Sequence, residues 1–306
     1  NLKTVLINYN KKSLLNNFLY MLNCIKQIYV INTSKIVLIT DNNYVISNFK
    51  REGIKVIQIW HATGAIKKFG NAIKREYPIK NYDYVIANSD YWKIPYQEAF
   101  NVLRDNVIVT GMPRVDHLVN DHYLQSTRVK LLQKYPILKN KKIVLYAPTF
   151  RGNIYQGFKS VSFNGKKLLD QLDDEYVLIY KFHPLLLNTE IPSDDRIINL
   201  SNEDTHDLFT VSDMLVSDFS SIIFDYAFLN KPMYFFVPDL DEYLNTLGCF
   251  VDYDKTMPGP ICFDEEQLAL AILKAKKYNL KYFLQTFFKY QDGNNTKRVV
   301  EFIKKL

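Results

Sequence analysis

One histidine of this chain stands where it could act as an acid–base catalyst. His61 lies in the stretch IQIWHATGAIKKFG, directly after a strand-like apolar run, and Thr63, Gly64 and Lys67 follow it closely. An imidazole at the exit of a buried strand can take up a proton near neutral pH without much tuning of its pKa. It can equally be a buried histidine bonded to the backbone, so the stretch on its own indicates either a base or a structural residue.

A pair of serines stands where a phosphate could bind. The stretch HDLFTVSDMLVSDFSSIIFDYAFLNKP, residues 206–232, contains a short strand, MLVS, that runs into DFSS at the start of a predicted helix. The free N–H groups and the positive dipole end of a helix start favour phosphate, and Ser220 and Ser221 add hydroxyl donors. Asp218 or Ser220 could instead simply cap the helix.

Three further motifs place basic residues after predicted strands. YKFHP carries Lys181 and His183, YAPTFRG carries Thr149 and Arg151, and GMPRVDHL carries Arg114. Arginine presents a planar fork that suits phosphate oxygens, and imidazole or ammonium groups add further donors. Each of these residues alone could form an ordinary ion pair or a structural contact. Gathered at one edge of a sheet, they predict an anion-binding pocket.

The strands that must position these residues fall into two sets, with room for helices between them. The first set is expected at 4–7, 35–40, 56–60, 84–87 and 107–109, and the second at 142–147, 176–182, 196–200, 213–218 and 232–238. Continuous apolar runs that alternate with helical patterns are typical of buried parallel strands in βα units. We therefore predict an α/β fold of two Rossmann-like domains, residues 1–118 and 119–306, with an interdomain cleft at the strand ends. The last helix is available to pack back onto the first domain.

The composition is that of a folded chain, and its positive charge favours an anionic partner or serves only to keep the surface soluble. The 306 residues are 47% hydrophobic and 23% charged, with a net charge of +7, which excludes disordered and fibrous classes. The lysines are scattered and no nucleic-acid-binding motif occurs, so we expect no nucleic acid as partner. Because Cys24, Cys249 and Cys262 form no pair with metal-ligand spacing and no acidic cage is evident, we expect no metal.

The N-terminal region bears on membrane contact. The stretch KKSLLNNFLYMLNCIKQI, residues 11–28, is interrupted by polar residues and is not predicted to span a membrane. It does place apolar side chains on one helical face and lysines for anionic headgroups nearby: Leu14, Leu15, Phe18, Leu19, Leu22 and Ile25, with Lys11, Lys12 and Lys26. The same pattern suits an ordinary Rossmann helix packed on its sheet. Because the chain begins at Asn1 rather than at methionine, an upstream targeting or anchoring segment stays open.

Six stretches, in this order, resemble one known family. QIWHATGAIKKFG, ANSDYW, GMPRVDHL, LYAPTFR, KFHP and DLFTVSDMLVSDFSSIIFDYAFLNKPMYFF together cover about residues 56–245. Their order and spacing are similar to those of the CDP-glycerol glycerophosphotransferase family, the teichoic acid primases and polymerases of Gram-positive bacteria. The resemblance implies a GT-B-type fold with the active site in the cleft, a CDP-alcohol donor and a membrane-embedded, lipid-linked acceptor, and it implies no cofactor.

The resemblance also implies roles for individual residues. His61 would be the base that deprotonates the acceptor hydroxyl, and His183 would donate to the phosphates. Ser220 and Ser221 would clamp the pyrophosphate. The residues that would surround the same substrate are Asp218, Arg114 and Arg151, with Thr63, Gly64, Lys67, Thr149 and Lys181 beside them. In the implied reaction a hydroxyl attacks the glycerol-bearing phosphorus and CMP leaves.

Two departures from the family pattern resemble a primase more than a polymerase. The chain has WHATG where many polymerases have WHGTP, and it lacks their long N-terminal extension. We therefore predict transfer of one glycerol phosphate from CDP-glycerol to an undecaprenyl-diphosphate-linked disaccharide. Residues 1–118 would face the acceptor and an anionic membrane surface, and residues 119–306 would bind CDP-glycerol, in an enzyme held peripherally at the cytoplasmic face of the cell membrane.

Four alternatives remain at this point. Within the family they are a teichoic acid polymerase and a homologue that uses CDP-ribitol, since the two donors share the cytidine diphosphate. Outside it they are a GT-B glycosyltransferase that uses a sugar nucleotide and a non-catalytic protein that binds a nucleotide as a regulatory ligand. The fold cannot distinguish these, because one fold carries many functions.

Overall fold

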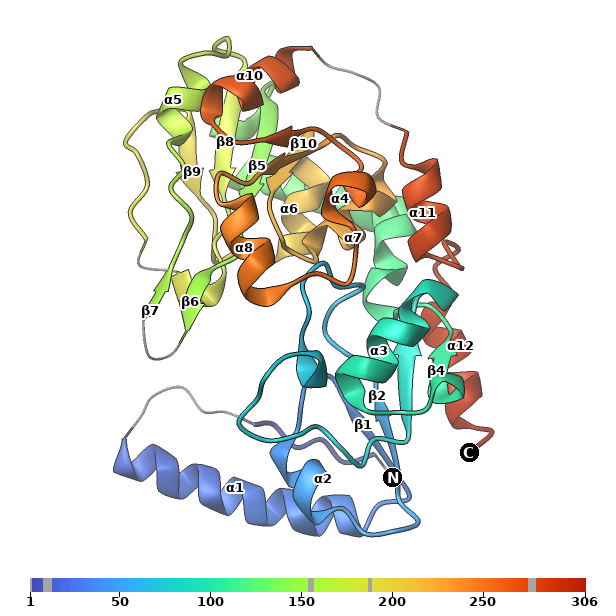
Figure 1. Ribbon diagram of the computed structural model, residues 1–306. Helices are drawn as coiled ribbons and strands as arrows, with labels where there is room; N and C mark the ends of the chain where they lie inside the picture. Colours follow the sequence, from blue (N-terminus) through green and yellow to red (C-terminus); the bar gives the residue numbers. More distant parts are fainter. Residues whose placement is uncertain (1, 8–12, 154–156, 187–188, 275–278) are drawn as a thin grey trace.

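The structure is a computed structural model that describes residues 2–7, 13–153, 157–186, 189–274 and 279–306. These residues form two separate parallel sheets and a short antiparallel hairpin. Helices lie against both sheets, and each sheet with its helices makes one lobe of the molecule (Figure 1). The predicted mixed α/β architecture with parallel sheets is therefore confirmed.

The first sheet is built from strands of the first half of the chain, in the order in which they occur. Its strands are β1 (Ile36–Ile39), β2 (Lys55–Gln58), β3 (Tyr84–Ala87) and β4 (Val107–Val109). The helices of this half are α1 (Leu14–Asn32), α2 (Tyr44–Phe49) and α3 (Lys93–Phe100). Val56, Ile57, Val85 and Ile86 are fully buried. Strands buried on both faces consist of continuous apolar runs, which is why the sequence marks them clearly.

The strand predicted at residues 4–7 does not form, so this prediction was wrong. Residues 2–7 have no regular structure, and Leu2 and Leu6 expose 91% and 72% of their surface. Among the described residues β1 pairs with β2 alone, and residues 2–7 and β1 line a groove of 770 Å³. A short apolar run becomes a strand only where it gains a ladder partner and a packed face, and this run gains neither.

The second sheet has the strand order β12-β11-β10-β5-β8-β9, and all its pairs are parallel. Its strands are β5 (Lys142–Ala147), β8 (Tyr176–Tyr180), β9 (Ile197–Asn199), β10 (Met214–Ser217), β11 (Met233–Phe236) and β12 (Ile261–Cys262). The five strands predicted for this half are confirmed. The sequence pattern did not predict β12 or the hairpin of β6 (Arg151–Asn153) and β7 (Gly157–Lys159), because such short strands have no periodicity to detect.

The helices of the second half cover this sheet and then return to the first. They are α4 (Asp121–Lys134), α5 (Gly165–Leu169), α6 (Thr205–Val211), α7 (Ile222–Tyr226), α8 (Leu240–Leu247), α9 (Tyr253–Thr256), α10 (Glu265–Leu273), α11 (Lys281–Phe287) and α12 (Asn295–Ile303). Short 3-10 turns add η1 (Gly70–Ala72), η2 (Asp90–Trp92), η3 (Arg104–Asn106), η4 (Pro113–Val119), η5 (Pro136–Leu138), η6 (Pro184–Leu186) and η7 (Ala227–Leu229). Helix α4 joins the two sheets in sequence and is bonded to α6 through Arg128, whose Nη1 donates to the carbonyl of Thr210 at 2.9 Å.

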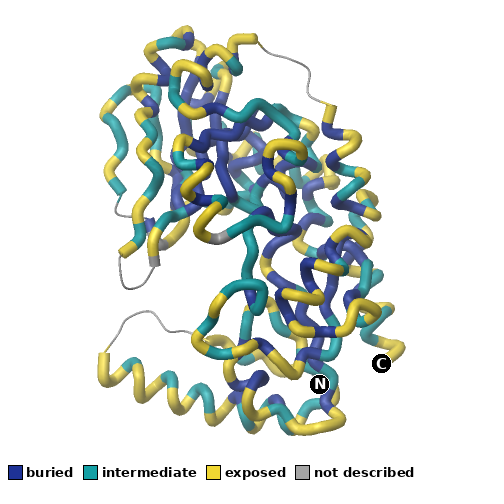
Figure 2. The backbone as a smooth tube through the Cα atoms, viewed as in Figure 1, coloured by how far each residue is buried: buried dark blue, intermediate teal, exposed yellow. Residues whose placement is uncertain are grey.

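An aromatic cluster joins the two halves. Trp92 from the first half lies 5.3 Å from Phe224 on α7 and 5.4 Å from Phe287 on α11, measured between ring centroids. Gly64 fits between these elements, since a Cβ there would stand 2.7 Å from Trp92 and 2.8 Å from Phe224. Figure 2 shows buried chain in both lobes. The loop that carries His61 is therefore packed against the second half through residues that tolerate no extra atom.

The last helix packs onto the first sheet. Phe302 on α12 lies 5.1 Å from Tyr84 on β3, and the Nδ2 of Asn295 donates to the carbonyl of Met112 at 3.2 Å. In Figure 1 this helix lies beside β4, at the C-terminal end of the chain. The domain limits at residues 118 and 119 stay a prediction.

Candidate active site

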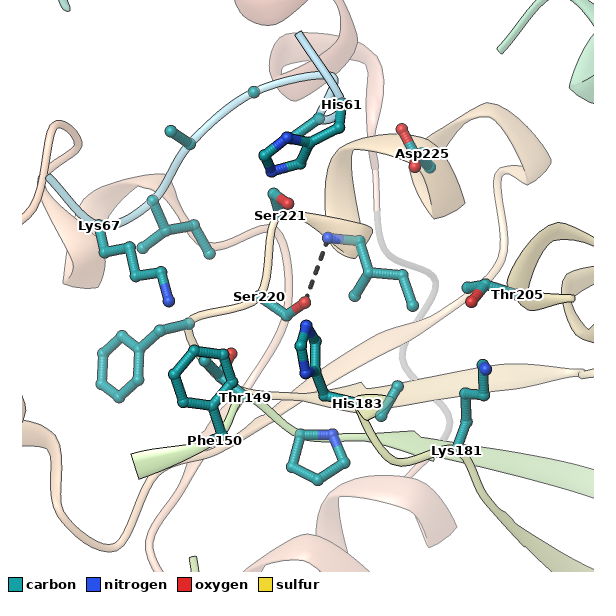
Figure 3. A pocket seen from close by; sticks show the side chains of 18 of the residues that line it. His61, Lys67, Thr149, Phe150, Lys181, His183, Thr205, Ser220, Ser221 and Asp225 are labelled. Carbon is teal, nitrogen blue, oxygen red and sulfur yellow. Dashed lines mark hydrogen bonds between the residues drawn. The ribbon is translucent and has the colours of Figure 1, made fainter. Parts of the chain in front are cut away.

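A pocket of about 570 Å³ is lined by residues from both halves of the chain. The predicted site residues in its wall are His61, Gly64, Lys67, Arg114, Thr149, Lys181, His183, Ser220 and Ser221. They follow the carboxyl ends of β2, β4, β5, β8 and β10, which is the edge where parallel sheets bind ligands. In the view of Figure 3 the two serines lie between His61 and His183, with Lys67 on one side and Lys181 on the other.

A left-handed backbone at Trp60 turns the chain so that His61 enters this pocket. The φ angle of Trp60 is 64°, a region that bulky side chains rarely adopt. Its N–H donates to the Oε1 of Gln58 at 2.8 Å, and its indole stacks on Phe69 with ring centroids 4.8 Å apart. Backbone strain of this kind persists where the surroundings hold it, and it is common at functional sites.

The contacts of His61 leave one ring nitrogen available. Its Nδ1 lies 3.2 Å from the carbonyl oxygen of Thr40 and 3.9 Å from a carboxylate oxygen of Asp41. A carbonyl oxygen only accepts hydrogen bonds, so this contact places the proton on Nδ1 and leaves the lone pair on Nε2. The side chain is 54% exposed. An exposed imidazole with a free Nε2 has the arrangement of a general base.

The loop after His61 is bonded to the second half. The N–H of Lys68 donates to the carbonyl of Gly248 at 3.1 Å, and the N–H of Phe250 donates to the carbonyl of Ile66 at 2.8 Å. Lys67 lies between these bonds and reaches the pocket, where its Nζ stands 5.1 Å from the ring centre of Phe150. Burial lowers the pKa of Lys67, although the charge of Asp218 opposes this.

The serine pair begins a helix, but a short one. Helix α7 has five residues, Ser221 is its N-cap, and no side chain makes the capping hydrogen bond there. The Oγ of Ser220 accepts only a long bond, 3.4 Å, from the N–H of Ile222 (Figure 3). So short a helix contributes little dipole, and the donors that this wall offers an anion are the two hydroxyl groups.

Asp218 and Arg151 do not line the pocket, contrary to the expectation from the sequence. Asp218 is buried, and its carboxylate accepts the N–H of Thr149 at 2.8 Å and Nη1 of Arg151 at 2.9 Å. Arg151 also donates to both carboxylate oxygens of Asp239, at 2.7 and 3.1 Å. The two carboxylates occupy the guanidinium, so these residues brace the loop that carries Thr149 behind the pocket wall.

Thr63 is also absent from the wall. It is 1% exposed, its Oγ1 is buried without a hydrogen-bond partner among the described residues, and its carbonyl accepts from the Nδ2 of Asn88. Asn88 also accepts the N–H of Met112 at 2.9 Å. Thr63 therefore belongs to the packing beneath the His61 loop.

Two further basic groups in the wall, His183 and Lys181, have pKa values below their ordinary values. Burial lowers the pKa of His183, and the charges of Lys67, Lys181 and His61 lower it further. Burial also lowers the pKa of Lys181, whose Nζ donates to the carbonyl of Ser201 at 2.7 Å. The lowered pKa of His183 favours its neutral form, which can donate one hydrogen bond to an anion.

Several wall residues were missed by the sequence reasoning. They are chiefly Thr205, Asp225, Phe150 and Phe182. Asp225 lies one helical turn after Ser221 on α7, so the i, i+4 spacing from the serine pair was the available signal. Its carboxylate is buried and accepts from the Nη2 of Arg114 at 3.0 Å.

Within the described part of the chain, no group of three or more histidine, cysteine, aspartate or glutamate side chains could hold a metal ion. No helix there is both long and apolar enough to cross a lipid bilayer.

A family model described as CDP-Glycerol:Poly(glycerophosphate) glycerophosphotransferase matches residues 4–305. The chain belongs to this family. The resemblance carried by the six sequence motifs is therefore confirmed, and the match covers nearly all of the chain.

Curated relatives include both primases and polymerases. The chain is 36% identical over 293 residues to a teichoic acid poly(ribitol-phosphate) polymerase of Bacillus spizizenii. This match covers 89% of the chain and 47% of that relative. It is 32% identical to the teichoic acid ribitol-phosphate primase of the same species, over 98% of the chain and 82% of the relative. It is 35% identical to the teichoic acid glycerol-phosphate primase of Bacillus subtilis, over 92% and 76%. The chain thus spans about half of the polymerase and most of each primase.

Solved structures agree on the fold. The wall teichoic acid polymerase TagF superposes with a TM-score of 0.72 at 25% identity, over 96% of this chain and 77% of that chain. A variant of TagF soaked with CDPG gives a TM-score of 0.74 at 26% identity, over 89% and 72%. A UDP-GlcNAc 2-epimerase from Neisseria meningitidis, 15% identical, has a TM-score of 0.59 over 98% of this chain and 84% of that chain, and shows the fold alone. The Rossmann-like fold with parallel sheets is common to all three.

Proposed function

We propose that this protein transfers glycerol phosphate from CDP-glycerol to a hydroxyl group of an undecaprenyl-diphosphate-linked disaccharide and releases CMP. The observation that carries the proposal is the pocket itself. It brings the free Nε2 side of His61, from the first half, toward Ser220, Ser221 and His183 of the second half. Membership of the glycerophosphotransferase family supports the same chemistry.

The proposed reaction is an in-line substitution at phosphorus. The Nε2 of His61 takes the proton of the acceptor hydroxyl, whose oxygen forms a bond to the glycerol-bearing phosphorus. The bond from this phosphorus to the bridging oxygen breaks, and CMP leaves with that oxygen. Arg114, Lys67 and Lys181 supply positive charge, while His183 and the two serines supply neutral donors. Positioning and charge stabilisation of this kind account for most of the rate acceleration in phosphoryl transfer.

We further propose that the two sheets belong to two domains of a GT-B-type fold, residues 1–118 and 119–306. The first would hold the acceptor and the second the cytidine diphosphate. Two arrangements support this division. The pocket is lined by residues from both halves. The proposed base, His61, comes from the first half, whereas the proposed phosphate-binding residues Ser220, Ser221 and His183 come from the second.

We propose a primase rather than a polymerase on the WHATG motif, whereas the sequence does not separate glycerol from ribitol as the alcohol of the donor. Relatives of both kinds match at similar identity, 32% and 35% for the two primases and 36% for the polymerase. Use of CDP-ribitol is a second candidate, because a ribitol-phosphate primase matches over 98% of the chain at an identity close to that of the glycerol-phosphate primase.

We also propose peripheral attachment at the cytoplasmic face of the membrane through α1. This helix has few buried residues and is exposed along most of its length (Figure 2). Its predicted apolar face is exposed, with fractions from 46% at Leu22 to 90% at Leu14. Lys26 is exposed, and Lys11 and Lys12 lie outside the described residues. Sedimentation with vesicles that contain anionic lipid checks this, and equal recovery with and without vesicles would reject it.

The central test measures CMP release with a soluble analogue of the lipid-linked disaccharide and reads product length by mass spectrometry. Wild type is compared on CDP-glycerol, CDP-ribitol and a UDP-sugar. We expect acceptor-dependent CMP and one added glycerol phosphate from CDP-glycerol. A ladder of products would make the protein a polymerase, and turnover with the UDP-sugar alone would make it a glycosyltransferase.

His61→Ala tests the base in the same assay. We expect turnover to fall by about 100-fold or more while CDP-glycerol affinity stays near that of wild type, because a base acts on the acceptor proton. His122→Ala is the matched control, since this exposed histidine on α4 lies outside the pocket wall. Full turnover by folded His61→Ala protein would remove His61 from the mechanism. If wild type binds the nucleotide but shows no turnover, the regulatory nucleotide-binding alternative would be favoured.

A further inference from the structure

A chain of four polar side chains begins in the pocket wall and links the two halves of the molecule. Arg114 and His117 belong to η4, His206 to α6 and Asp225 to α7. The Oδ2 of Asp225 lies 3.0 Å from the Nη2 of Arg114 and 3.0 Å from the Nε2 of His206. The Nδ1 of His206 lies 2.9 Å from the Nε2 of His117. Of these four residues, only Arg114 was predicted from the sequence to lie at the site.

The donor and acceptor roles in this chain follow from its geometry. Asp225 is a carboxylate that accepts from Arg114, so the Nε2 of His206, at the same oxygen, must carry a proton to donate. The Nδ1 of His206 shares a second hydrogen bond with the Nε2 of His117, 2.9 Å away. Burial, and next the neighbouring His206, lowers the pKa of His117, which keeps this ring neutral. Arg114 and Asp225 form the ion pair of this chain, and the Nη2 of Arg114 also lies 3.3 Å from the Nε2 of His206.

Asp225 directs its contacts toward Arg114 and His206. Its side chain is 4% exposed, and its other oxygen, Oδ1, is buried with no hydrogen-bond partner among the described residues. His206 is similarly buried, at 8%. A buried carboxylate that accepts from an arginine and a histidine is rigid, because all three side chains are held by packing as well as by hydrogen bonds.

Arg114 is held at one end and open at the other. Its Nη2 donates to Asp225 and lies 3.3 Å from the Nε2 of His206, while its Nε and Nη1 make no hydrogen bond within the described part of the chain. Its side chain is 38% exposed and lines the pocket beside Ser221 and Thr205. A guanidinium fixed by one nitrogen presents its remaining donors in a set direction, which suits bidentate contact with phosphate oxygens.

We propose that Asp225, itself held by His206, is a positioning residue that aims the free edge of Arg114 at the diphosphate of the nucleotide donor. This inference rests on the proposed function, which makes that diphosphate the ligand. For the removal of Asp225, this role predicts a change in anion affinity opposite to the one that charge neutralisation alone predicts. If Asp225 only neutralised Arg114, its removal would strengthen anion binding, whereas a positioning role requires that its removal weaken binding.

The test measures the dissociation constant of CDP, the probe shared by all the candidate donors, by calorimetry. We expect Asp225→Asn to raise it by about tenfold, because a charge-assisted bond to Arg114 becomes a neutral one and the guanidinium loses its fixed direction. Arg114→Ala alone should raise it as much or more. In the double variant Asp225→Asn should add nothing further, because it acts through Arg114. Unchanged or tighter CDP binding by folded Asp225→Asn protein, or an additive effect in the double variant, would overturn the proposal.

Two further variants keep the test independent of folding. His206→Gln keeps a donor for Asp225 and should bind CDP within about twofold of wild type, whereas His206→Leu should resemble Asp225→Asn. Asp207→Asn is the matched control, since Asp207 neighbours His206 on α6 but accepts from Tyr123 outside the pocket wall. Equal affinity in His206→Gln and His206→Leu would exclude a role for the histidine in holding Asp225.

The same data separate this inference from the proposed function. CDP binding without CMP release in wild type would remove the enzymatic proposal, while the variants would still decide the role of Asp225. CMP release with CDP affinity unaffected by Asp225→Asn would remove the inference and leave the enzyme. Wild type that binds no nucleoside diphosphate would overturn both.

Discussion

Two arginine–aspartate pairs lie near the pocket, and they differ in how much of the arginine is occupied. Arg151 donates through Nε, Nη1 and Nη2 to Asp218 and Asp239, and its side chain is 11% exposed. Arg114 donates through Nη2 to Asp225 and is 38% exposed. Both arginines follow a strand of a parallel sheet, and the sequence motifs gave them equal weight. The number of carboxylates that reach each guanidinium decides whether it braces the fold or is free for a ligand.

The two pairs should therefore separate stability from binding. Asp218 is 1% exposed, so Arg151 balances a charge that has no access to water. Asp225 is buried as well, but it retains His206 as a second hydrogen-bond partner. Loss of one arginine should destabilise the fold, and loss of the other should mainly reduce nucleotide affinity.

The largest expected effect is that of Arg151→Ala. Removal of one partner of a buried ion pair leaves an uncompensated charge, and we expect the free energy of unfolding to fall by about 3–5 kcal/mol. Urea denaturation measures this. Arg104→Ala is the control, because Arg104 is exposed on η3 and forms no ion pair within the described residues. A stable Arg151→Ala protein with weakened CDP binding would reverse the roles assigned to the two arginines.

A smaller effect is expected for Arg114→Ala. We predict that CDP affinity falls by about 10- to 30-fold, about 1.4–2 kcal/mol, because two or more charge-assisted contacts to phosphate are lost. The free energy of unfolding should change by less than it does in Arg151→Ala, since Asp225 keeps the bond from His206. Calorimetric titration and urea denaturation of the same preparation provide the two numbers. If both arginine variants lost stability alike, the distinction between brace and ligand group would fail.

The smallest expected effect is a pH dependence of stability that arises at His117, which is linked through His206 to the Arg114–Asp225 pair. Burial lowers the folded-state pKa of His117 below its ordinary 6.5, and the nearby His206 and Arg114 act in the same direction, whereas Asp204 and Asp225 oppose it. The unfolded chain therefore binds the proton more readily, and stability falls as pH drops below 6.5. Partial exposure of the ring keeps the effect small. Melting temperatures between about pH 7.5 and 5.5 should fall more for wild type than for His117→Gln, and parallel curves would show that His117 carries none of the dependence.

Much of the fold could be read from local sequence. The strands of both sheets, apart from β12 and the β6–β7 hairpin, are marked by continuous apolar runs, and their buried residues confirm why. The strand predicted at residues 4–7 does not form, because apolar character alone does not supply a neighbouring strand to pair with. The hairpin that follows Arg151 depends on pairing between Arg151 and Lys159, which no local pattern expresses.

The candidate site was predicted in part. Placement after a strand was enough to identify His61, His183 and the serine pair, because the carboxyl ends of parallel strands meet at one edge. It was not enough to show that Thr63 turns into the packing beneath its loop, or that Asp225 stands behind Arg114. These outcomes depend on partners from other elements of the chain.

By itself the sequence determined the family, the two sets of parallel strands and the motifs that meet at their ends, because these features are written in local runs of residue types. Only the tertiary structure decided which arginine is available to a ligand. Arg151 is bonded to carboxylates that lie 67 and 88 residues further along the chain. Arg114 is bonded to a carboxylate on α7, in the second half. The charge of a side chain is local information, but the number of its partners depends on how distant segments pack.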